Sequence, residues 1–580
     1  MQYSADIQKL PRHFLPGDFS ITDWDGLEPY FKDLEERPIS SLTDLEQWMK
    51  DASELEAVIS EDACWRQIRM TCDTESKELE NAFTYFMMEI QPKIQPYSDR
   101  LNKKLLDCPF TRDLDESKYY TYLRNVKKNI ELFREANIPL QADLNVMQQQ
   151  FGVISGKMTV EVNGQEYTLQ QAAKFLEDPD RRLREEVYHK INERRLNDKE
   201  ELNNLFSLLL GKRHQVALNT GFGNFRDYRF AELGRFDYTK EDCYQFHEAV
   251  KLHVMPLVDQ IYEMKKKKLG LDTLRPWDVE AEPAGIQPLR PFKNGEELAA
   301  KTITCFDEMF TESSGQSFFG DCLRKMKAMG HLDLESRKGK APGGYNCPLA
   351  ESGAPFIFMN AAGQLDDVTT MVHEGGHAIH SFLAHELELT GFKEYPTEIA
   401  EVASMAMELF SMHHWHVFFN NKEELTRAKE QQLERVITIF PWIATIDKFQ
   451  HWIYEHPVHT EEERAAQWLI ILDEFTSPVL NMDGLDKYRR FAWQRQLHLY
   501  EVPFYYIEYG IAQLGAIGLW QQYKKDPAVA INNYINALKL GGTKTLPELF
   551  KAAGLTFDLS PAYIHELMLF VKQELDDLGN

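Results

Sequence analysis

Apolar residues recur at steps of three and four along most of this 580-residue chain, with charged residues between them. The segments Asp44–Ile59, Ser76–Ile94 and Ser117–Phe133 show the pattern most clearly. Side chains three or four positions apart lie on one face of an α-helix, so each segment is typical of an amphipathic helix that packs on a core. The sequence therefore predicts a mainly α fold.

One local departure is a hairpin signal near residues 158–169, where two short strand-like segments flank Asn163-Gly164. Asn-Gly is the preferred pair for a two-residue hairpin turn, because both positions need a positive φ. We place a boundary near residue 195, after the helix that follows this hairpin. The chain would then consist of a helical N-terminal region, 1–195, and a second helical region, 196–580.

Charge excludes some classes of partner. The chain has 65 Lys and Arg against 91 Asp and Glu, which gives a net charge of −26. Nucleic-acid binding needs clustered cations on one face, so we expect no nucleic-acid partner and no docking on anionic membranes. No stretch offers the roughly 20 apolar residues of a membrane span. The closest, Val502–Trp520, is interrupted by Glu508 and Gln513 and is typical of a buried helix.

The cysteines and the N-terminus bear on the compartment. The seven cysteines are odd in number and lack paired metal-binding spacing, which favours a reduced compartment over a disulfide framework. The N-terminal segment has no apolar core behind a basic start, so it does not have the pattern of a secretory signal. We expect a cytoplasmic protein, and the sequence leaves its oligomeric state open.

A candidate metal site lies in the predicted helix Leu365–Leu383. His373 and His377 are four residues apart, so their imidazoles lie on one helical face and can reach one ion. Glu374 is rotated by about 100° from His373, which places it beside the ion as a base for an activated water. Two histidines on an ordinary solvated or buried helix are the structural alternative.

Two further features favour the metal site. Gly375 and Gly376 lie in the middle of this helix, where each costs about 0.8–1 kcal/mol relative to alanine. A helix that a neighbour or substrate must approach closely has a reason for them. A third ligand is available in the helical stretch 396–408, where Glu398 and Glu401 lie on a largely apolar stripe. Carboxylates there are costly to bury without a partner, and spacing alone does not choose between them.

These residues resemble the thimet oligopeptidase and oligoendopeptidase F family of zinc peptidases. The metal motif begins at His373, Gly343-Gly-Tyr-Asn346 precedes a predicted strand at Ala354–Asn360, and His498 begins a Tyr-rich segment that ends at Tyr509. The resemblance is strong over residues 340–515 and weaker over the first 150. The hairpin near residue 163 is similar to the oligoendopeptidase F branch.

The resemblance implies a role for several residues. It makes Glu401 the third metal ligand beside His373 and His377, with one Zn²⁺ per chain, and Glu374 the general base. Glu408 would orient a ligating histidine, and His380 would be structural. Catalytic hydrogen-bond donors would come from His498, Tyr506 and Tyr509, with Tyr505 as an adjacent competitor for the tyrosine role. The segments that would bind the substrate strand contain Gly343, Gly344, Tyr345, Ala354 and Phe356.

The resemblance also implies a fold and an activity. The fold would be a helical ellipsoid around a deep substrate channel, with a zincin-like catalytic region that contains a small β-sheet and lies within 196–580. The activity would be zinc-dependent endopeptidase cleavage of short unfolded oligopeptides, and a peptide could add as a strand beside Ala354–Asn360. Alternatives are a zinc carboxypeptidase or dipeptide-releasing exopeptidase and a non-catalytic helical scaffold.

Overall fold

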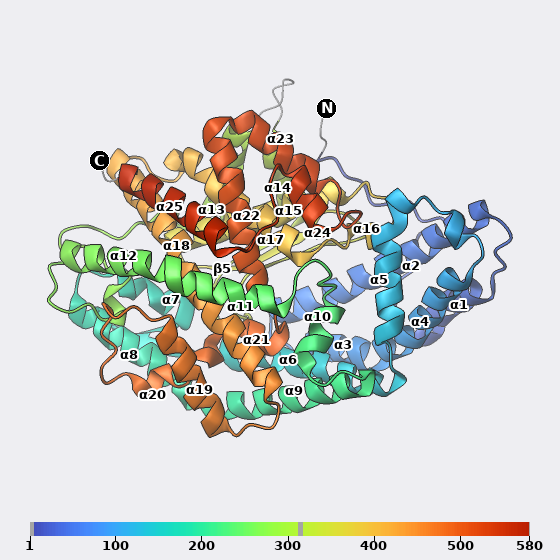
Figure 1. The fold of residues 1–580 in the computed structure, drawn as a ribbon, viewed down its shortest axis with the longest axis horizontal. Helices are drawn as coiled ribbons and strands as arrows, with labels where there is room; N and C mark the ends of the chain where they lie inside the picture. The colour runs from blue at the N-terminus through green and yellow to red at the C-terminus, as the bar shows by residue number, and fades with distance from the viewer. Residues whose placement is uncertain (1–4, 311–316, 579–580) are drawn as a thin grey trace.

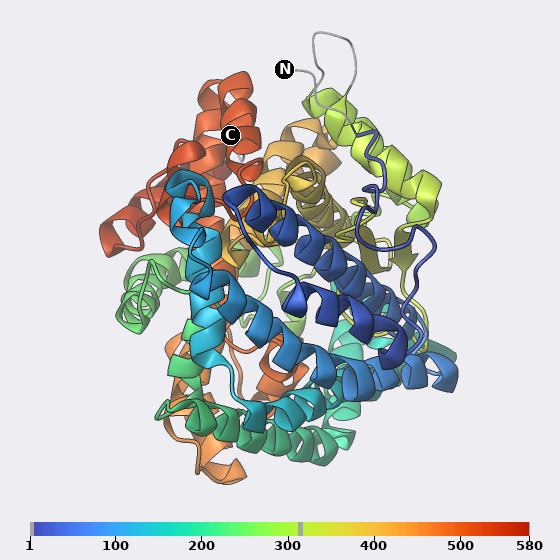
Figure 2. The ribbon, with the colours of Figure 1, turned by 90° about the vertical axis from the view of Figure 1, so that its right-hand side faces the viewer.

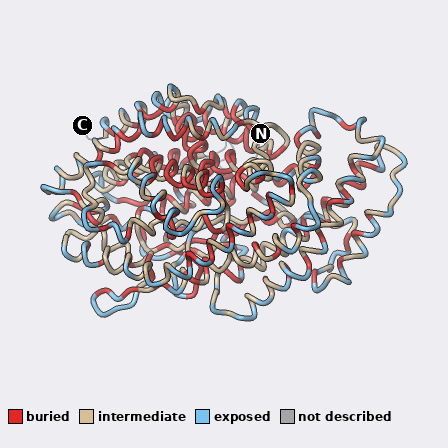
Figure 3. The backbone as a smooth tube through the Cα atoms, turned by 60° about the horizontal axis from the view of Figure 1, so that its bottom comes forward, coloured by how far each residue is buried: buried red, intermediate tan, exposed pale blue. Residues whose placement is uncertain are grey.

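The chain folds into a mainly helical body with two small sheets (Figure 1), as the sequence predicts. This computed structural model describes residues 5–310 and 317–578. Among the described residues, no helix combines the length and apolarity that a membrane span requires. Buried residues concentrate in the middle of the body and exposed residues at its periphery (Figure 3).

The first nine helices build the N-terminal part of the chain, and the earliest of them form one flank of the molecule (Figure 2). Their bounds are α1 Trp24–Glu36, α2 Leu42–Cys72, α3 Lys77–Tyr85, α4 Gln91–Asp107, α5 Glu116–Leu132, α6 Ile138–Gly156, α7 Leu169–Ala173, α8 Arg181–Asn197 and α9 Lys199–Thr220.

The remaining helices surround and form the central core. Their bounds are α10 Phe225–Glu232, α11 Lys240–Ala249, α12 Met255–Lys268, α13 Gly295–Met309, α14 Phe318–Met329, α15 Leu365–Ala384, α16 Thr390–Lys393, α17 Thr397–Ser411, α18 Lys422–Glu455, α19 Glu461–Glu474, α20 Asp486–Arg489, α21 Leu497–Glu501, α22 Tyr506–Lys525, α23 Pro527–Leu538, α24 Leu546–Ala552 and α25 Pro561–Leu578.

The helix expected over Ser76–Ile94 is interrupted. A π-helical turn, Phe86–Ile90, separates α3 from α4. Pro92 stands at the start of α4 and has no backbone N–H to donate to the preceding turn, so the regular hydrogen-bond ladder cannot continue through this point. The periodicity of the side chains survives the turn, which is why the sequence pattern looks continuous.

The N-terminal helices have an apolar core of their own. Leu27, Leu45, Trp48 and Phe86 belong to this cluster, which Phe392 of α16 joins from the later part of the chain. A larger core includes residues from Ala5 to Leu575 and holds the central helices together. The boundary near residue 195 stays a prediction.

Two small sheets accompany the helices. Strands β1, Thr159–Val162, and β2, Gln165–Thr168, pair antiparallel around Asn163-Gly164. Both turn residues have a positive φ, 52° and 77°, as the turn requires. The second sheet has the order β3-β5-β4.

The order of the second sheet corrects one expectation. Strand β5, Phe356–Ala361, lies in the middle, parallel to β3, Leu332–Glu335, and antiparallel to β4, Tyr345–Cys347. Both edges of β5 are therefore occupied, and the expectation that a peptide adds beside Ala354–Asn360 is wrong. No other strand of the described residues pairs with the outer edge of β4, which is therefore open. Sequence patterns could not reveal this, because strand order is a long-range property.

Candidate active site

Helix α15 presents His373 and His377 to a large cavity, and helix α17 brings Glu401 opposite them. The Nε2 atom of His373 lies 3.3 Å from Oε2 of Glu401, and Nε2 of His377 lies 3.5 Å from Oε1. One ligand atom from each of the three lies within 4.8 Å of the other two. Two imidazoles and a carboxylate at this spacing fit the donor set of a catalytic zinc ion, which leaves one position open.

The alternative ligand Glu398 points elsewhere. Its Oε1 atom accepts a hydrogen bond of 2.6 Å from the buried Tyr238 hydroxyl, whereas Glu401 contacts both histidines. The two carboxylates are one helical turn apart on α17, so the choice depends on how α17 is rotated against α15. That rotation is a packing property and was not accessible from spacing.

The two glycines of α15 are required by close packing. A Cβ atom on Gly376 would lie 2.6 Å from the carbonyl oxygen of Ala403 in α17, and one on Gly375 would lie 2.7 Å from the ring of Phe306. Real Cβ atoms do not approach other atoms so closely. Gly376 therefore lets the backbone of α17 come near enough for Glu401 to reach the two histidines.

A further carboxylate holds the ring of His373. Glu408, two turns after Glu401, accepts a hydrogen bond of 2.8 Å from Nδ1 of His373. Its other oxygen accepts from the Gln432 side chain at 3.0 Å. A carboxylate on the distal nitrogen fixes the tautomer and orientation of a ligating imidazole, so Nε2 is the nitrogen left for an ion.

The electrostatics of this group favour a cation. Burial lowers the pKa of His373, but the carboxylates of Glu401 and Glu408 outweigh it and raise that pKa well above its usual value. Burial also raises the pKa of Glu401, yet the neighbouring histidines and the Tyr505 hydroxyl lower it to about 2. Burial lowers the pKa of His377 to about 4, so its imidazole is neutral at pH 7. Two carboxylates around two imidazoles suit one divalent ion.

Glu374 is buried beside the histidines. Its Oε2 atom has no hydrogen-bond partner among the described residues, and burial raises the pKa of its carboxyl group to about 8. Gly344 lies against it, since a Cβ there would be 3.5 Å from Oε1 of Glu374. The carboxylate therefore faces the space between α15 and β4 rather than a fixed protein partner.

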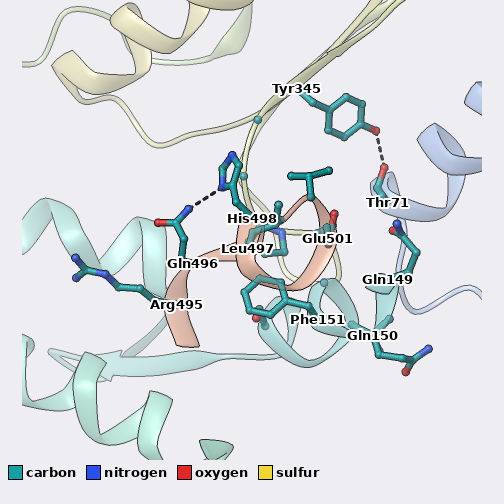
Figure 4. A pocket seen from close by; sticks show the side chains of 18 of the residues that line it. Thr71, Gln149, Gln150, Phe151, Tyr345, Arg495, Gln496, Leu497, His498 and Glu501 are labelled. Carbon is teal, nitrogen blue, oxygen red and sulfur yellow. Dashed lines mark hydrogen bonds between the residues drawn. The ribbon is translucent and has the colours of Figure 1, made fainter. Parts of the chain in front are cut away.

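The His498 segment completes the other side of the cavity. Gln496 donates a hydrogen bond of 2.7 Å to Nδ1 of His498 (Figure 4), which assigns the ring proton to Nε2. That nitrogen lies 3.0 Å from the Tyr509 hydroxyl. Tyr505 donates a hydrogen bond of 2.5 Å to Oε1 of Glu401. Its nearness to the proposed ligand set was not foreseen, because it depends on how the start of α22 packs against α17.

Tyr506 occupies a different place from its neighbours. Its ring lies edge-on to His498, with 5.0 Å between centroids. It lines a smaller cavity of about 220 Å³, which His373, Glu374 and Tyr509 also border. The large cavity is lined by Tyr505 and Tyr509 but not by Tyr506. Of the two tyrosines expected from the sequence, the structure brings Tyr509 into the large cavity and leaves Tyr506 outside it.

The large cavity has a volume of about 750 Å³, within the usual range for ligand sites. Of the residues expected at the substrate strand, Gly343, Gly344 and Tyr345 line it, whereas Ala354 and Phe356 are buried in the core. The Tyr345 hydroxyl is 2.6 Å from that of Thr71 on α2 (Figure 4), which ties strand β4 to the N-terminal helices.

His380 lies outside the ligand group. Its ring is 1% exposed and stacks on Tyr395 with 3.6 Å between centroids. Burial lowers the pKa of this imidazole to about 3, so it is neutral. This position is the one expected of a structural histidine.

The sequence did not single out Arg195 and Arg495, which also line the large cavity. Neither forms an ion pair with a described residue, and Arg495 lies over the Trp442 ring at 4.4 Å. Burial and repulsion from Arg495 lower the pKa of Arg195 to about 10, so Arg195 is charged at pH 7, and burial also lowers the pKa of Arg495. No motif signals such a pair, because the two residues are 300 positions apart.

Comparison with known proteins agrees with this geometry. The family model for peptidase family M3 matches residues 174–569, and that for the peptidase M3 N-terminal domain matches residues 14–133. An oligoendopeptidase F homolog from Borreliella burgdorferi is 23% identical over 82% of this chain and 79% of its own length. The chromosomal oligoendopeptidase F of Lactococcus lactis subsp. cremoris is 22% identical, over 57% of this chain and 53% of its own.

Solved structures are similar over almost the whole chain. PZ peptidase A, solved with an inhibitor, has a TM-score of 0.90 and 25% identity, and the alignment covers 97% of this chain and 99% of that one. A protein assigned as a candidate oligoendopeptidase F gives a TM-score of 0.90 and 26% identity over 97% and 98% of the two chains.

The helical fold and the His, His and Glu group in a large cavity define a metallopeptidase. The chain belongs to peptidase family M3, because that family model matches more than half of it. The resemblance to the oligoendopeptidase F branch is confirmed by both the sequence relatives and the solved structures.

Proposed function

We propose that this protein is a zinc-dependent endopeptidase that hydrolyses short, unfolded oligopeptides. The observation that carries the proposal is the arrangement of His373, His377 and Glu401 within ligand distance of one another, on the wall of a cavity of about 750 Å³. The names of its relatives, oligoendopeptidase F among them, support the substrate class.

The peptide would bind as an extended strand along the open edge of β4. Main-chain hydrogen bonds along a sheet edge bind a peptide without reading its side chains. Gly343 and Gly344 line the same cavity as Glu374. A folded protein offers no free strand of this kind, so the cavity favours unfolded chains.

Zinc at the His373, His377 and Glu401 set would polarise the scissile carbonyl and lower the pKa of water toward about 7. Glu374 would take the proton from the attacking water and pass it to the leaving nitrogen. A carboxylate beside the attacking water can accept its proton and then return it to the leaving group. The hydroxyl group of Tyr509, which His498 contacts, would donate to the developing oxyanion, and Tyr505 would hold the Glu401 carboxylate through its hydrogen bond.

The test is the variant Glu374→Gln. It should keep one catalytic zinc ion and lose roughly 10²–10⁴-fold in kcat on an internally quenched peptide. Glu386→Gln, a change at an exposed position after α15, is the matched control and should behave as the wild type. Activity that survives Glu374→Gln with bound zinc would rule out this residue as the base.

A second candidate activity is the release of short C-terminal fragments. Arg195 and Arg495 support it, because they place two cations without carboxylate partners in the cavity. Guanidinium groups bind carboxylates by charge-assisted hydrogen bonds, so the pair could hold the C-terminus of a peptide. Product masses from peptides of graded length distinguish the two activities, since an exopeptidase releases the same number of residues from each.

A further inference from the structure

A second group of metal-ligating side chains lies away from the cavity. Cys243 of α11 and Asp447 and His451 of α18 meet in the core, with exposed fractions of 0%, 0% and 2%. One ligand atom from each lies within 4.8 Å of the other two, as in the catalytic group. None of the three lines the large cavity, so peptide hydrolysis does not account for them.

The distance between His451 and Asp447 is that of two neighbouring ligands. Nε2 of His451 lies 3.3 Å from Oδ2 of Asp447, but neither ring nitrogen of His451 has a hydrogen-bond partner among the described residues. The same 3.3 Å separates His373 and Glu401 in the catalytic group. Donors about 2.0–2.1 Å from a tetrahedral zinc ion lie about 3.3–3.4 Å from one another. The contact therefore has the length of a ligand pair without the direction of a hydrogen bond.

One oxygen of the buried Asp447 carboxylate has no hydrogen-bond partner among the described residues. Its Oδ2 atom accepts a hydrogen bond of 2.8 Å from Nε2 of His247, and its Oδ1 atom has no partner. No lysine or arginine in the described part of the chain pairs with it. A buried carboxylate costs several kcal/mol unless a cation or enough donors compensate it. A divalent ion shared with the Cys243 thiolate would make the group neutral.

The sequence positions suit a site that joins two helices. Cys243 and His247 are four residues apart on α11, and Asp447 and His451 are four residues apart on α18. The two residues of each pair therefore lie on one face of their helix. The hydrogen bond between His247 and Asp447 shows that these two faces meet. His247 would orient Asp447 through their hydrogen bond, in the way that Glu408 orients His373.

Aromatic rings close the group off from water. The His451 ring has its centroid 4.9 Å from that of Tyr244 and 5.4 Å from that of Phe504. Phe504 directly precedes Tyr505 and is one of two residues other than glycine with a positive φ in the described chain, at 66°. The three candidate ligands are themselves at most 2% exposed, so an ion bound there would be structural.

We propose that Cys243, Asp447 and His451 form a second metal site, which binds zinc and fastens α11 to α18 beneath Phe504. One thiolate, one imidazole and a carboxylate that can bind through both oxygens supply four donor atoms. This mixture of sulfur, nitrogen and oxygen donors favours zinc over magnesium or calcium, which take oxygen ligands.

Metal analysis of the purified full chain tests the site. The wild type should hold two zinc ions per chain, and both the Cys243→Ser and the His451→Gln variant should hold one. The double variant His373→Ala/His377→Ala should also hold one, because it removes only the catalytic ion. A wild type that saturates at one zinc per chain, or a His373→Ala/His377→Ala protein that holds none, would overturn the proposal.

Cobalt provides an independent readout, because the catalytic group contains no sulfur. Protein reconstituted with Co²⁺ should show a thiolate-to-cobalt charge-transfer band in the near ultraviolet, and Cys243→Ser should abolish it. Cys322→Ser, a change at another fully buried cysteine, is the matched control and should retain the band. If Cys243→Ser does not fold, the spectrum of the cobalt-substituted wild type is sufficient as a test. Absence of the charge-transfer band there would contradict a cysteine ligand.

Discussion

Glu408 accepts a hydrogen bond of 2.8 Å from Nδ1 of His373, while Glu401 faces Nε2 of the same ring at 3.3 Å. Glu408 therefore fixes the orientation of the His373 ring through Nδ1. The other nitrogen, Nε2, faces the candidate metal position next to Glu401. Both carboxylates come from one stripe of α17, so the orientation of a single helix sets the ligand and its support together.

Replacement of Glu408 should weaken metal binding more than it slows the reaction. Glu408→Gln removes the charge behind His373, and loss of such a partner costs about 10–100-fold in metal affinity. Competition with a chelator measures this affinity, and excess zinc should restore most of the activity. Glu386→Gln is the control. An unchanged zinc affinity in Glu408→Gln would contradict the supporting role.

Gly376→Ala should damage both stability and metal binding. The added Cβ would meet the backbone of Ala403 at 2.6 Å, so α17 must move away, at a cost of about 1–3 kcal/mol. Gly211→Ala in the middle of α9 is the matched control, because nothing lies within 4 Å of its Cβ position. That change should raise stability by about 0.5–1 kcal/mol. Chemical denaturation and zinc titration of both variants measure the contrast, and equal effects would refute it.

The loss of activity on replacement of Tyr505, Tyr506 or Tyr509 should depend on where each side chain lies around the site. Tyr509→Phe removes a hydroxyl group that faces the cavity, and loss of an oxyanion donor lowers kcat by roughly 10²–10³-fold. Tyr505→Phe removes the hydrogen-bond donor to Glu401 and should also reduce activity. Tyr506→Phe should have a much smaller effect, because Tyr506 does not line the large cavity. Steady-state kinetics on one peptide give the order. A larger effect of Tyr506→Phe than of Tyr509→Phe would contradict this order.

Arg495 should recognise a substrate carboxylate. Arg495→Gln should reduce the preference for a peptide with a free C-terminus over its amide by roughly tenfold or more, the value of a charge-assisted hydrogen bond. Arg490→Gln, whose arginine pairs with Glu462, is the matched control. A peptide with Glu replaced by Gln separates side-chain recognition from recognition of the terminus. If the wild type cleaves the peptide with a free C-terminus and its amide equally well, the carboxylate subsite is excluded. The proposed peptidase activity itself is not affected by that result.

Asp278 should make stability depend on acidic pH. The carboxyl group is fully buried and bonded to Arg181 at 2.7 Å and Arg184 at 2.8 Å. Burial raises its pKa, but the two arginines outweigh burial and hold that pKa below its ordinary value. Because the folded pKa is below the unfolded one of about 3.9, the stabilisation is complete above roughly pH 5 and is lost as the pH falls further.

The variant Asp278→Asn checks this expectation. It leaves Arg184 buried without a charged partner, so the loss at neutral pH should be about 3–5 kcal/mol. The difference from the wild type should shrink as the pH falls below 4. Glu186→Gln, in the exposed pair with Lys190, is the control and should cost less than about 1 kcal/mol. A difference that stays constant between pH 7 and pH 3 would contradict the assignment.

Much of the fold and part of the site were accessible from local patterns. The helices, the hairpin turn and the shared face of His373 and His377 follow from short-range spacing. The choice of Glu401 over Glu398 needed the rotation of α17, and the place of Tyr505 needed the packing of α22. The order of strands β4 and β5 depends on contacts that no local pattern encodes.

The buried group around Asp447 illustrates the same limit. The steps from Cys243 to His247 and from Asp447 to His451 are visible in the sequence. Nothing there indicates that two helices about 200 residues apart in the chain face each other. The cysteines lack paired spacing among themselves, and the relevant spacing is from a cysteine to a histidine.

The open edge of β4 has a consequence for how substrates are selected. An unpaired strand edge on a protein surface invites aggregation with other strands, but here the strand residues Tyr345 and Asn346 line the inside of the large cavity. Only a single chain thin enough to enter can reach them. Such an enzyme would select substrates first by the width of the chain and only then by its side chains. It would not cleave the folded proteins around it, including other copies of itself.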